Sequence, residues 1–147
     1  MKREFFVWTD RMRLPAIADI ATALTAVGFE CRAQSQQGNT QDPLHWTSIQ
    51  LETEADGATH SCIIRVDLPA REQIDQLVED YEDLPYQVKS ASRRYTILAE
   101  SDEYGQAEPF QLQVVAALAR LTNGAVEDSQ EAGLMMLDEF EEFIASV

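Results

Sequence analysis

The residues that decide the fold are 93–128, which read RRYTILAESDEYGQAEPFQLQVVAALARLTNGAVED. The first eight are rich in β-forming side chains and predict a strand. Residues 109–121 begin with a proline, which the first turn of a helix accepts, and continue with apolar side chains on most sides. Such a helix must be buried, so it is predicted to be the central element of the core. Asn123-Gly124 ends it, and residues 125–128 predict another strand.

Predicted strands and helices alternate through the rest of the chain. The earlier strands are expected at Glu4–Thr9, Phe29–Gln34, Trp46–Thr53 and Ser61–Leu68, a brief late one at 134–136, the other helices at 15–27, 69–84 and from Leu137 onward, and a polar loop at 36–43. The order β-α-β-β-β-α-β-α-β-α predicts an α+β fold, with residues 1–147 as a single domain. We expect one mostly antiparallel or mixed sheet of five to six strands, packed with three to four helices.

The charge of the chain is its outlying property. The 147 residues are 45% hydrophobic and 25% charged, as in globular proteins, but the net charge is −15. Residues 101–147 hold one basic side chain, Arg120, against ten Asp and Glu, so this part carries −9. Such a surface repels nucleic acid and anionic membranes, because both are negatively charged. If charge selects a partner, that partner is basic.

The start of the chain and its apolar runs indicate a compartment. No positively charged start followed by an apolar run is present, and no apolar run approaches the roughly 20 residues of a membrane span. We therefore expect a cytoplasmic protein. Two cysteines, Cys31 and Cys62, are too few for a disulfide framework, and neither belongs to a Cys-x-x-Cys pair.

Familiar cofactor and metal motifs are absent from the sequence. No two of the six glycines fall within eight residues of each other, which excludes the dinucleotide and P-loop motifs. His45 and His60 flank a predicted hairpin and, with Cys31 or Cys62, are residue types that zinc accepts, but no pair has a diagnostic spacing. We favour solvent-facing histidines and buried cysteines. Residues 102–105 are too short for a calcium loop. No metal and no cofactor is predicted.

Nucleophilic catalysis has weak support. Cys62 and His60 would share one face of a strand, but no third partner is evident. With 26 Asp and Glu, carboxylate pairs arise by chance and identify no glycosidase site. We therefore expect a protein that is not an enzyme.

Two further groups have a structural and a ligand-binding interpretation. Arg93-Arg94 is expected to neutralise the acidic residues 79–83, and otherwise Arg93 would hold a small anion. The aromatic residues Phe5, Phe6, Trp8 and Trp46 are expected in the core, and otherwise they would line a ligand pocket.

The most distinctive feature is two runs of carboxylates on predicted helix faces. One run is Glu79, Asp80, Glu82 and Asp83, and the other is Asp138, Glu139, Glu141 and Glu142. They form either a solvated surface that maintains solubility or a docking surface whose field speeds association with a basic protein. Exposed charges add little affinity, so docking also needs apolar anchors, for which Tyr81, Tyr86 and Tyr104 are the candidates.

One segment carries a resemblance. Residues 118–130, LARLTNGAVEDSQ, resemble the helix, glycine and Asp-x-Gln strand of small uncharacterised bacterial α+β proteins, some of which are grouped with the immunity proteins that neutralise secreted toxins. The resemblance covers about a tenth of the chain and carries no functional residue over. It implies a bacterial protein with an immunity-type role.

The first hypothesis is therefore a non-enzymatic bacterial protein that binds a basic protein partner. The alternative is a small-molecule-binding or enzymatic domain whose pocket is lined by Trp8, Trp46 and one of His45, His60 or Arg93. Homodimerisation through a sheet edge or the last helix is compatible with both. The first hypothesis requires exposed carboxylates with few internal basic partners, whereas the second requires a cavity where a guanidinium or imidazole meets aromatic side chains.

Overall fold

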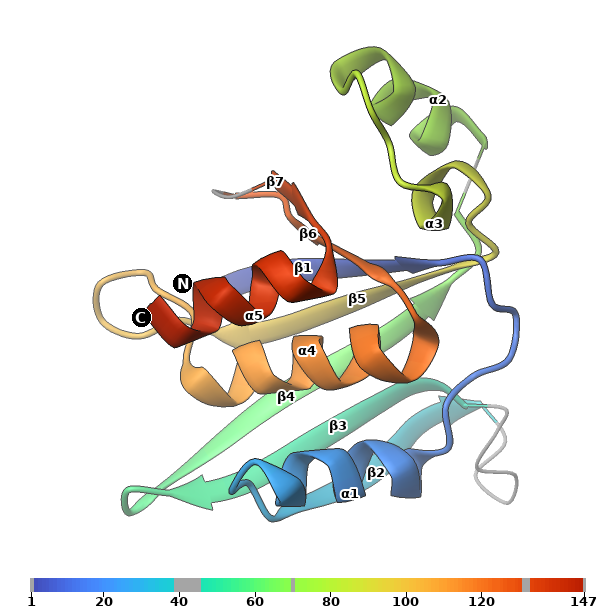
Figure 1. Ribbon diagram of the computed structural model, residues 1–147. Coiled ribbons are helices and arrows are strands. Elements are labelled where there is room, and N and C mark those ends of the chain that lie inside the picture. Colours follow the sequence, from blue (N-terminus) through green and yellow to red (C-terminus); the bar gives the residue numbers. More distant parts are fainter. Residues whose placement is uncertain (1, 39–45, 70, 131–132, 147) are drawn as a thin grey trace.

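A computed structural model of the chain describes residues 2–38, 46–69, 71–130 and 133–146. These residues form an α+β fold with one antiparallel sheet of seven strands and five helices (Figure 1). The strands are β1 (Lys2–Thr9), β2 (Cys31–Gly38), β3 (Trp46–Ala55), β4 (Ala58–Asp67), β5 (Arg93–Glu100), β6 (Ala125–Asp128) and β7 (Gly133–Met135). The helices are α1 (Ile17–Ala26), α2 (Arg71–Asp80), α3 (Tyr86–Lys89), α4 (Pro109–Thr122) and α5 (Leu137–Ser146).

The first strand lies inside the sheet, between two strands from the second half of the chain. The strand order is β2-β3-β4-β5-β1-β6-β7, and every pair is antiparallel. The β3–β4 hairpin closes through Asp56 and Gly57, which both have positive φ, as a two-residue hairpin turn requires. The hairpin that was predicted between His45 and His60 is confirmed. The pairing of β1 with β5 sets Trp8 opposite Arg94.

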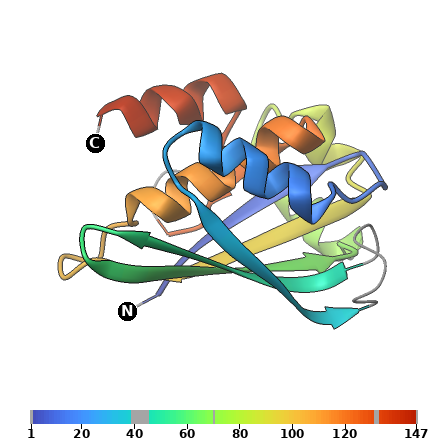
Figure 2. The ribbon, with the colours of Figure 1, turned by 90° about the horizontal axis from the view of Figure 1, so that it is seen from below.

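Helices cover the two faces of the sheet unequally. Helices α1, α4 and α5 pack on one face, and α2 and α3 lie on the other beside β1 (Figures 1 and 2). Because side chains alternate along a strand, Phe5 and Val7 enter the larger apolar core, whereas Phe6 and Trp8 face α2. β1 is therefore apolar on both faces, as its sequence predicts.

Helix α4 is the central helix, as its sequence predicts. Ten of its residues are buried, and it contacts α1, α5 and strands β1, β4, β5 and β6. Its buried Gln111 donates hydrogen bonds to the carbonyl oxygens of Arg3 and Ile97, at 2.9 and 3.2 Å. A polar side chain within this core thus links the helix to the two strands below it.

Several expectations about the number and bounds of elements are corrected. The described chain has seven strands instead of five to six and five helices instead of three to four. The helix missing from the expected order is α3, which has a single turn and is too short to leave a periodic pattern. β7, which has three residues, lies where a brief strand was expected at 134–136 but was not counted in that order. β2 extends to Gly38, so the loop expected at 36–43 begins too early, and its remainder lies outside the described residues.

The segment that carries the resemblance has a structural role at its end. The buried Asp128 carboxylate accepts a hydrogen bond from Arg3 of β1, at 2.9 Å. The Gln130 side chain accepts from the Glu4 backbone N–H at 2.9 Å and donates to the Lys2 carbonyl at 3.3 Å. Asp128 and Gln130 therefore fasten the end of β6 to the start of β1.

Candidate functional site

Both predicted runs of carboxylates are exposed. Glu79 and Asp80 end α2, and Glu82 and Asp83 follow it in a bend; we call these four the α2 acidic cluster. The α5 acidic cluster consists of Asp138, Glu139, Glu141 and Glu142 on the last helix, and all eight side chains are exposed.

Basic partners of these clusters are few. Within the described residues the one ion pair that involves them joins Glu141 to Arg120, with 2.7 Å between Oε1 and Nη2. Both side chains of that pair are about half exposed, so it contributes about 0–1 kcal/mol. Arg93 and Arg94 do not neutralise the α2 cluster, so that interpretation is wrong. Arg93 donates to the Met12 carbonyl, and Arg94 lies 3.9 Å from Asp67.

Strand β7 lies between the two acidic clusters. Its Leu134 and Tyr81, which follows α2, both pack against the smaller apolar core, and the Tyr81 hydroxyl lies next to Gly133. Helix α5 starts two residues after β7 and contacts it. β7 is also the last strand of the sheet within the described chain. The clusters therefore flank a sheet edge that is open among the described residues.

The three candidate tyrosines lie in different environments. Tyr81 is half-buried and packs against the smaller apolar core, so most of its ring is not available to a partner. Tyr86 is 53% exposed, and its hydroxyl accepts a hydrogen bond from Asn123 at 2.7 Å. Tyr104 is 80% exposed in the turn before α4. Tyr86 and Tyr104 remain candidates for anchors, whereas Tyr81 is poorly placed for that role.

The two tryptophans do not share a pocket, so that part of the alternative hypothesis is wrong. Trp46 is buried in the larger core, where its indole N–H donates to the Pro15 carbonyl at 3.0 Å. Trp8 is buried on the opposite face of the sheet, beneath α2. Phe5 also lies in the larger core, and Phe6 is half-buried beside Trp8.

A pocket of about 370 Å³ lies between α2 and the sheet, and we call it the α2 pocket. Phe6 and Trp8 of β1, Arg94 of β5 and Glu127 of β6 form its floor, and Glu72, Gln73, Gln76 and Leu77 of α2 form its other wall. Its guanidinium belongs to Arg94 and not to Arg93, because β1–β5 pairing sets Arg94 opposite Trp8. The sequence indicates an aromatic pocket with an arginine, but the strand register is needed to decide which arginine lines it.

Side chains of opposite charge, Arg94 and Glu127, line the α2 pocket. The Arg94 guanidinium carbon lies 4.4 Å from the centre of the Phe6 ring and 5.4 Å from that of Trp8. The Trp8 indole N–H donates to a Glu127 oxygen at 2.9 Å. Burial raises the pKa of the Glu127 carboxyl, while the Trp8 hydrogen bond and the charge of Arg94 act against that increase.

Glu127→Gln is expected to change how stability depends on pH. Because folding raises the pKa of Glu127, its contribution to the free energy of unfolding falls as pH rises from the ordinary pKa of a glutamate through the raised pKa. Glutamine keeps an acceptor for the Trp8 indole and does not titrate. The variant should therefore gain stability relative to the natural protein across this interval, as measured by urea unfolding at several pH values.

The control is Glu103→Gln, which removes an exposed carboxyl from the turn before α4. If Glu127→Gln and Glu103→Gln change the free energy of unfolding by the same amount at every pH, then Glu127 is not held in a desolvated site.

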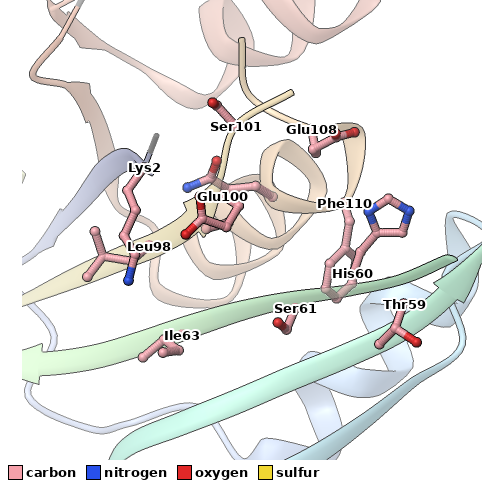
Figure 3. Close-up of a pocket in the computed structure, with 12 residues that line it drawn as sticks. Lys2, Thr59, His60, Ser61, Ile63, Leu98, Glu100, Ser101, Glu108 and Phe110 are labelled. Carbon is pink, nitrogen blue, oxygen red and sulfur yellow. The ribbon is translucent and has the colours of Figure 1, made fainter. Parts of the chain in front are cut away.

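His60 lines another cavity, of about 270 Å³, where β4 begins and β5 ends. Figure 3 shows His60 and Phe110 together on one side of this cavity, and Lys2 and Glu100 on the other. His60 therefore meets an aromatic side chain, but not Trp8 or Trp46. His45 lies outside the described residues, so the position proposed for it is not described.

The cysteines do not form a catalytic or metal centre with His60. Cys62 is fully buried, and burial raises the pKa of its thiol, so the reactive thiolate is disfavoured. Burial also raises the pKa of Cys31, and Thr53 of β3 lies between Cys31 and His60 in the sheet. Over residues 2–38, 46–69, 71–130 and 133–146, no three His, Cys, Asp or Glu side chains are grouped closely enough to hold a metal ion.

Comparisons with models of protein families, with curated proteins and with solved structures find no match to this chain. No helix in the described parts of the chain is both long enough and apolar enough to cross a membrane.

Proposed function

We propose that this protein is a non-enzymatic binding module that docks a basic protein through the α2 and α5 acidic clusters, in an immunity or inhibitor role in a bacterial cytoplasm. One observation carries the proposal: eight exposed carboxylates, of which only Glu141 forms an ion pair with another described residue. Helix faces that serve solubility alone need no such concentration of one sign, because mixed charges are sufficient.

In recognition of this kind, the association rate and the affinity depend on different features of the surface. The field of a chain with net charge −15 attracts a basic surface over a distance and raises the association rate. Affinity then depends on apolar contacts, for which Tyr86 and Tyr104 are exposed, and on backbone hydrogen bonds at the open edge of β7. A second copy of the chain is a poorer occupant, because two copies of equal negative charge repel each other.

Neutralising the α5 cluster is expected to weaken capture of a basic partner by about tenfold or more at low salt. The test variant carries four substitutions, Asp138→Asn, Glu139→Gln, Glu141→Gln and Glu142→Gln. A matched control removes four exposed charges elsewhere, through Asp10→Asn, Glu30→Gln, Asp56→Asn and Glu103→Gln. Each protein is immobilised and exposed to bacterial lysate at low and high salt, and the captured proteins are quantified.

The control separates a docking surface from a general charge effect, because both variants have the same net charge. Capture that falls in the α5 variant and persists in the control, and that weakens with salt, supports the proposal. Equal loss in both variants would attribute capture to net charge alone, and capture that is insensitive to salt would contradict acidic docking.

A further inference from the structure

The α2 pocket holds two opposite charges that do not pair with each other. Within the described chain, the buried Arg94 Nε has no hydrogen-bond partner, and the nearest carboxylate, Asp67, lies 3.9 Å from Nη2, beyond hydrogen-bond distance. No ion pair joins Arg94 to Glu127 in the described residues, although both line the same pocket. A buried donor without a partner destabilises the protein unless something else satisfies it.

We propose that the α2 pocket binds a small zwitterion of the α-amino acid class, with its carboxylate on Arg94 and its ammonium group on Glu127. The planar guanidinium offers parallel N–H donors, which match a carboxylate in a two-bond arrangement. One Glu127 oxygen is held by the Trp8 indole, so the carboxylate is oriented while the other oxygen can accept from an ammonium group.

The surroundings favour a zwitterion over a simple ion. A simple anion would satisfy Arg94 and leave Glu127 without an opposite charge, and a simple cation would satisfy Glu127 and leave Arg94 without one. A zwitterion has no net charge and places each group beside its opposite. Glu72 of α2 also lines the pocket and adds a second carboxylate to it.

Size and lining restrict the ligand further. A volume of about 370 Å³ lies near the lower end for small-molecule sites. Phe6, Trp8 and Leu77 supply the apolar part of the wall, so an amino acid with an apolar side chain fits better than a charged one. This inference is independent of docking at the acidic clusters, which end α2 and cover α5.

The two tryptophans provide a direct test. In ¹⁵N-labelled protein, the Trp8 indole N–H reports on the pocket, and the Trp46 indole, on the opposite face of the sheet, serves as an internal control. L-leucine and L-phenylalanine are titrated to about 10 mM, a range that detects millimolar binding. We expect a saturable shift of the Trp8 indole signal with an unchanged Trp46 signal. No shift at Trp8 with either amino acid would overturn the proposal.

Ligand analogues test the two charges on the natural protein. N-acetyl-L-leucine lacks the ammonium group and L-leucinamide lacks the carboxylate, so each should bind at least about tenfold more weakly than L-leucine. If N-acetyl-L-leucine binds as tightly as L-leucine, the site is an anion site and the zwitterion assignment is wrong.

Protein variants assign the two groups to residues. Arg94→Gln and Glu127→Gln should each weaken L-leucine binding by about tenfold or more, with the Trp46 signal confirming that each variant is folded. The control is Arg65→Gln, which removes an exposed arginine from the same face of the sheet on β4. Equal affinity in Arg94→Gln and the control would overturn the role of Arg94. If Arg94→Gln does not fold, Arg94→Lys keeps the charge, and the loss of its fork geometry should still weaken binding.

Discussion

Replacing Asp128 with alanine is expected to lower the free energy of unfolding by about 3–5 kcal/mol, the range for breaking a buried ion pair. Asp128 Oδ2 accepts from Arg3 Nη2 at 2.9 Å, and the two side chains are 0% and 4% exposed. The guanidinium also lies over the Phe5 ring, 5.3 Å from its centre. Without the carboxylate, the charge of Arg3 stays at a buried position and loses this ion pair, so the folded state is disfavoured.

Urea unfolding followed by far-UV circular dichroism measures this effect. Glu141→Ala is the matched control, because it removes one carboxylate from an arginine on the surface, and it should cost less than about 1 kcal/mol. The double variant Arg3→Met with Asp128→Leu should recover most of the stability, since it removes the buried charge together with its partner. A double variant as unstable as Asp128→Ala would locate the cost in packing and not in the loss of the ion pair between Arg3 and Asp128.

Local patterns in the sequence were sufficient for most elements of the fold. The helix at 109–122 was predictable because apolar side chains lie on most of its sides, and the β3–β4 turn because an Asp-Gly pair, here Asp56-Gly57, readily adopts positive φ. The α+β class and the exposure of both acidic clusters follow from the same kind of pattern. What these features share is that residues close in the chain determine them.

The α2 pocket could be predicted only in part, because distant segments build it. Trp8 meets Arg94 through a pairing of strands that are far apart in the chain, and Glu127 arrives from a third strand. Side-chain alternation then decides between Arg93 and Arg94, so an uncertainty of one residue in register exchanges them. Trp8 and Trp46 were expected in the core and are buried, but the sequence alone did not show that they lie on opposite faces of the sheet, which excludes the alternative of a pocket that they share.

Gly124→Ala is expected to lower the free energy of unfolding by about 3 kcal/mol, near the upper end for overpacking a core. The end of α4 is set by Asn123, which takes the left-handed conformation at φ 52°, and Gly124 serves a different purpose. A Cβ at Gly124 would lie 2.6 Å from Val7 Cγ1 and 2.9 Å from the Trp8 carbonyl oxygen. That oxygen belongs to the backbone of a central strand and cannot move without disturbing the sheet.

The neighbouring residue supplies the control for Gly124→Ala. Asn123→Gly keeps a residue that adopts positive φ readily and loses the exposed hydrogen bond to Tyr86, so its effect should stay within about 1 kcal/mol. Thermal and urea unfolding of the two variants compare a steric requirement with a conformational one at adjacent positions. If Gly124→Ala is as mild as Asn123→Gly, the close approach of α4 to β1 is not what requires glycine at this position.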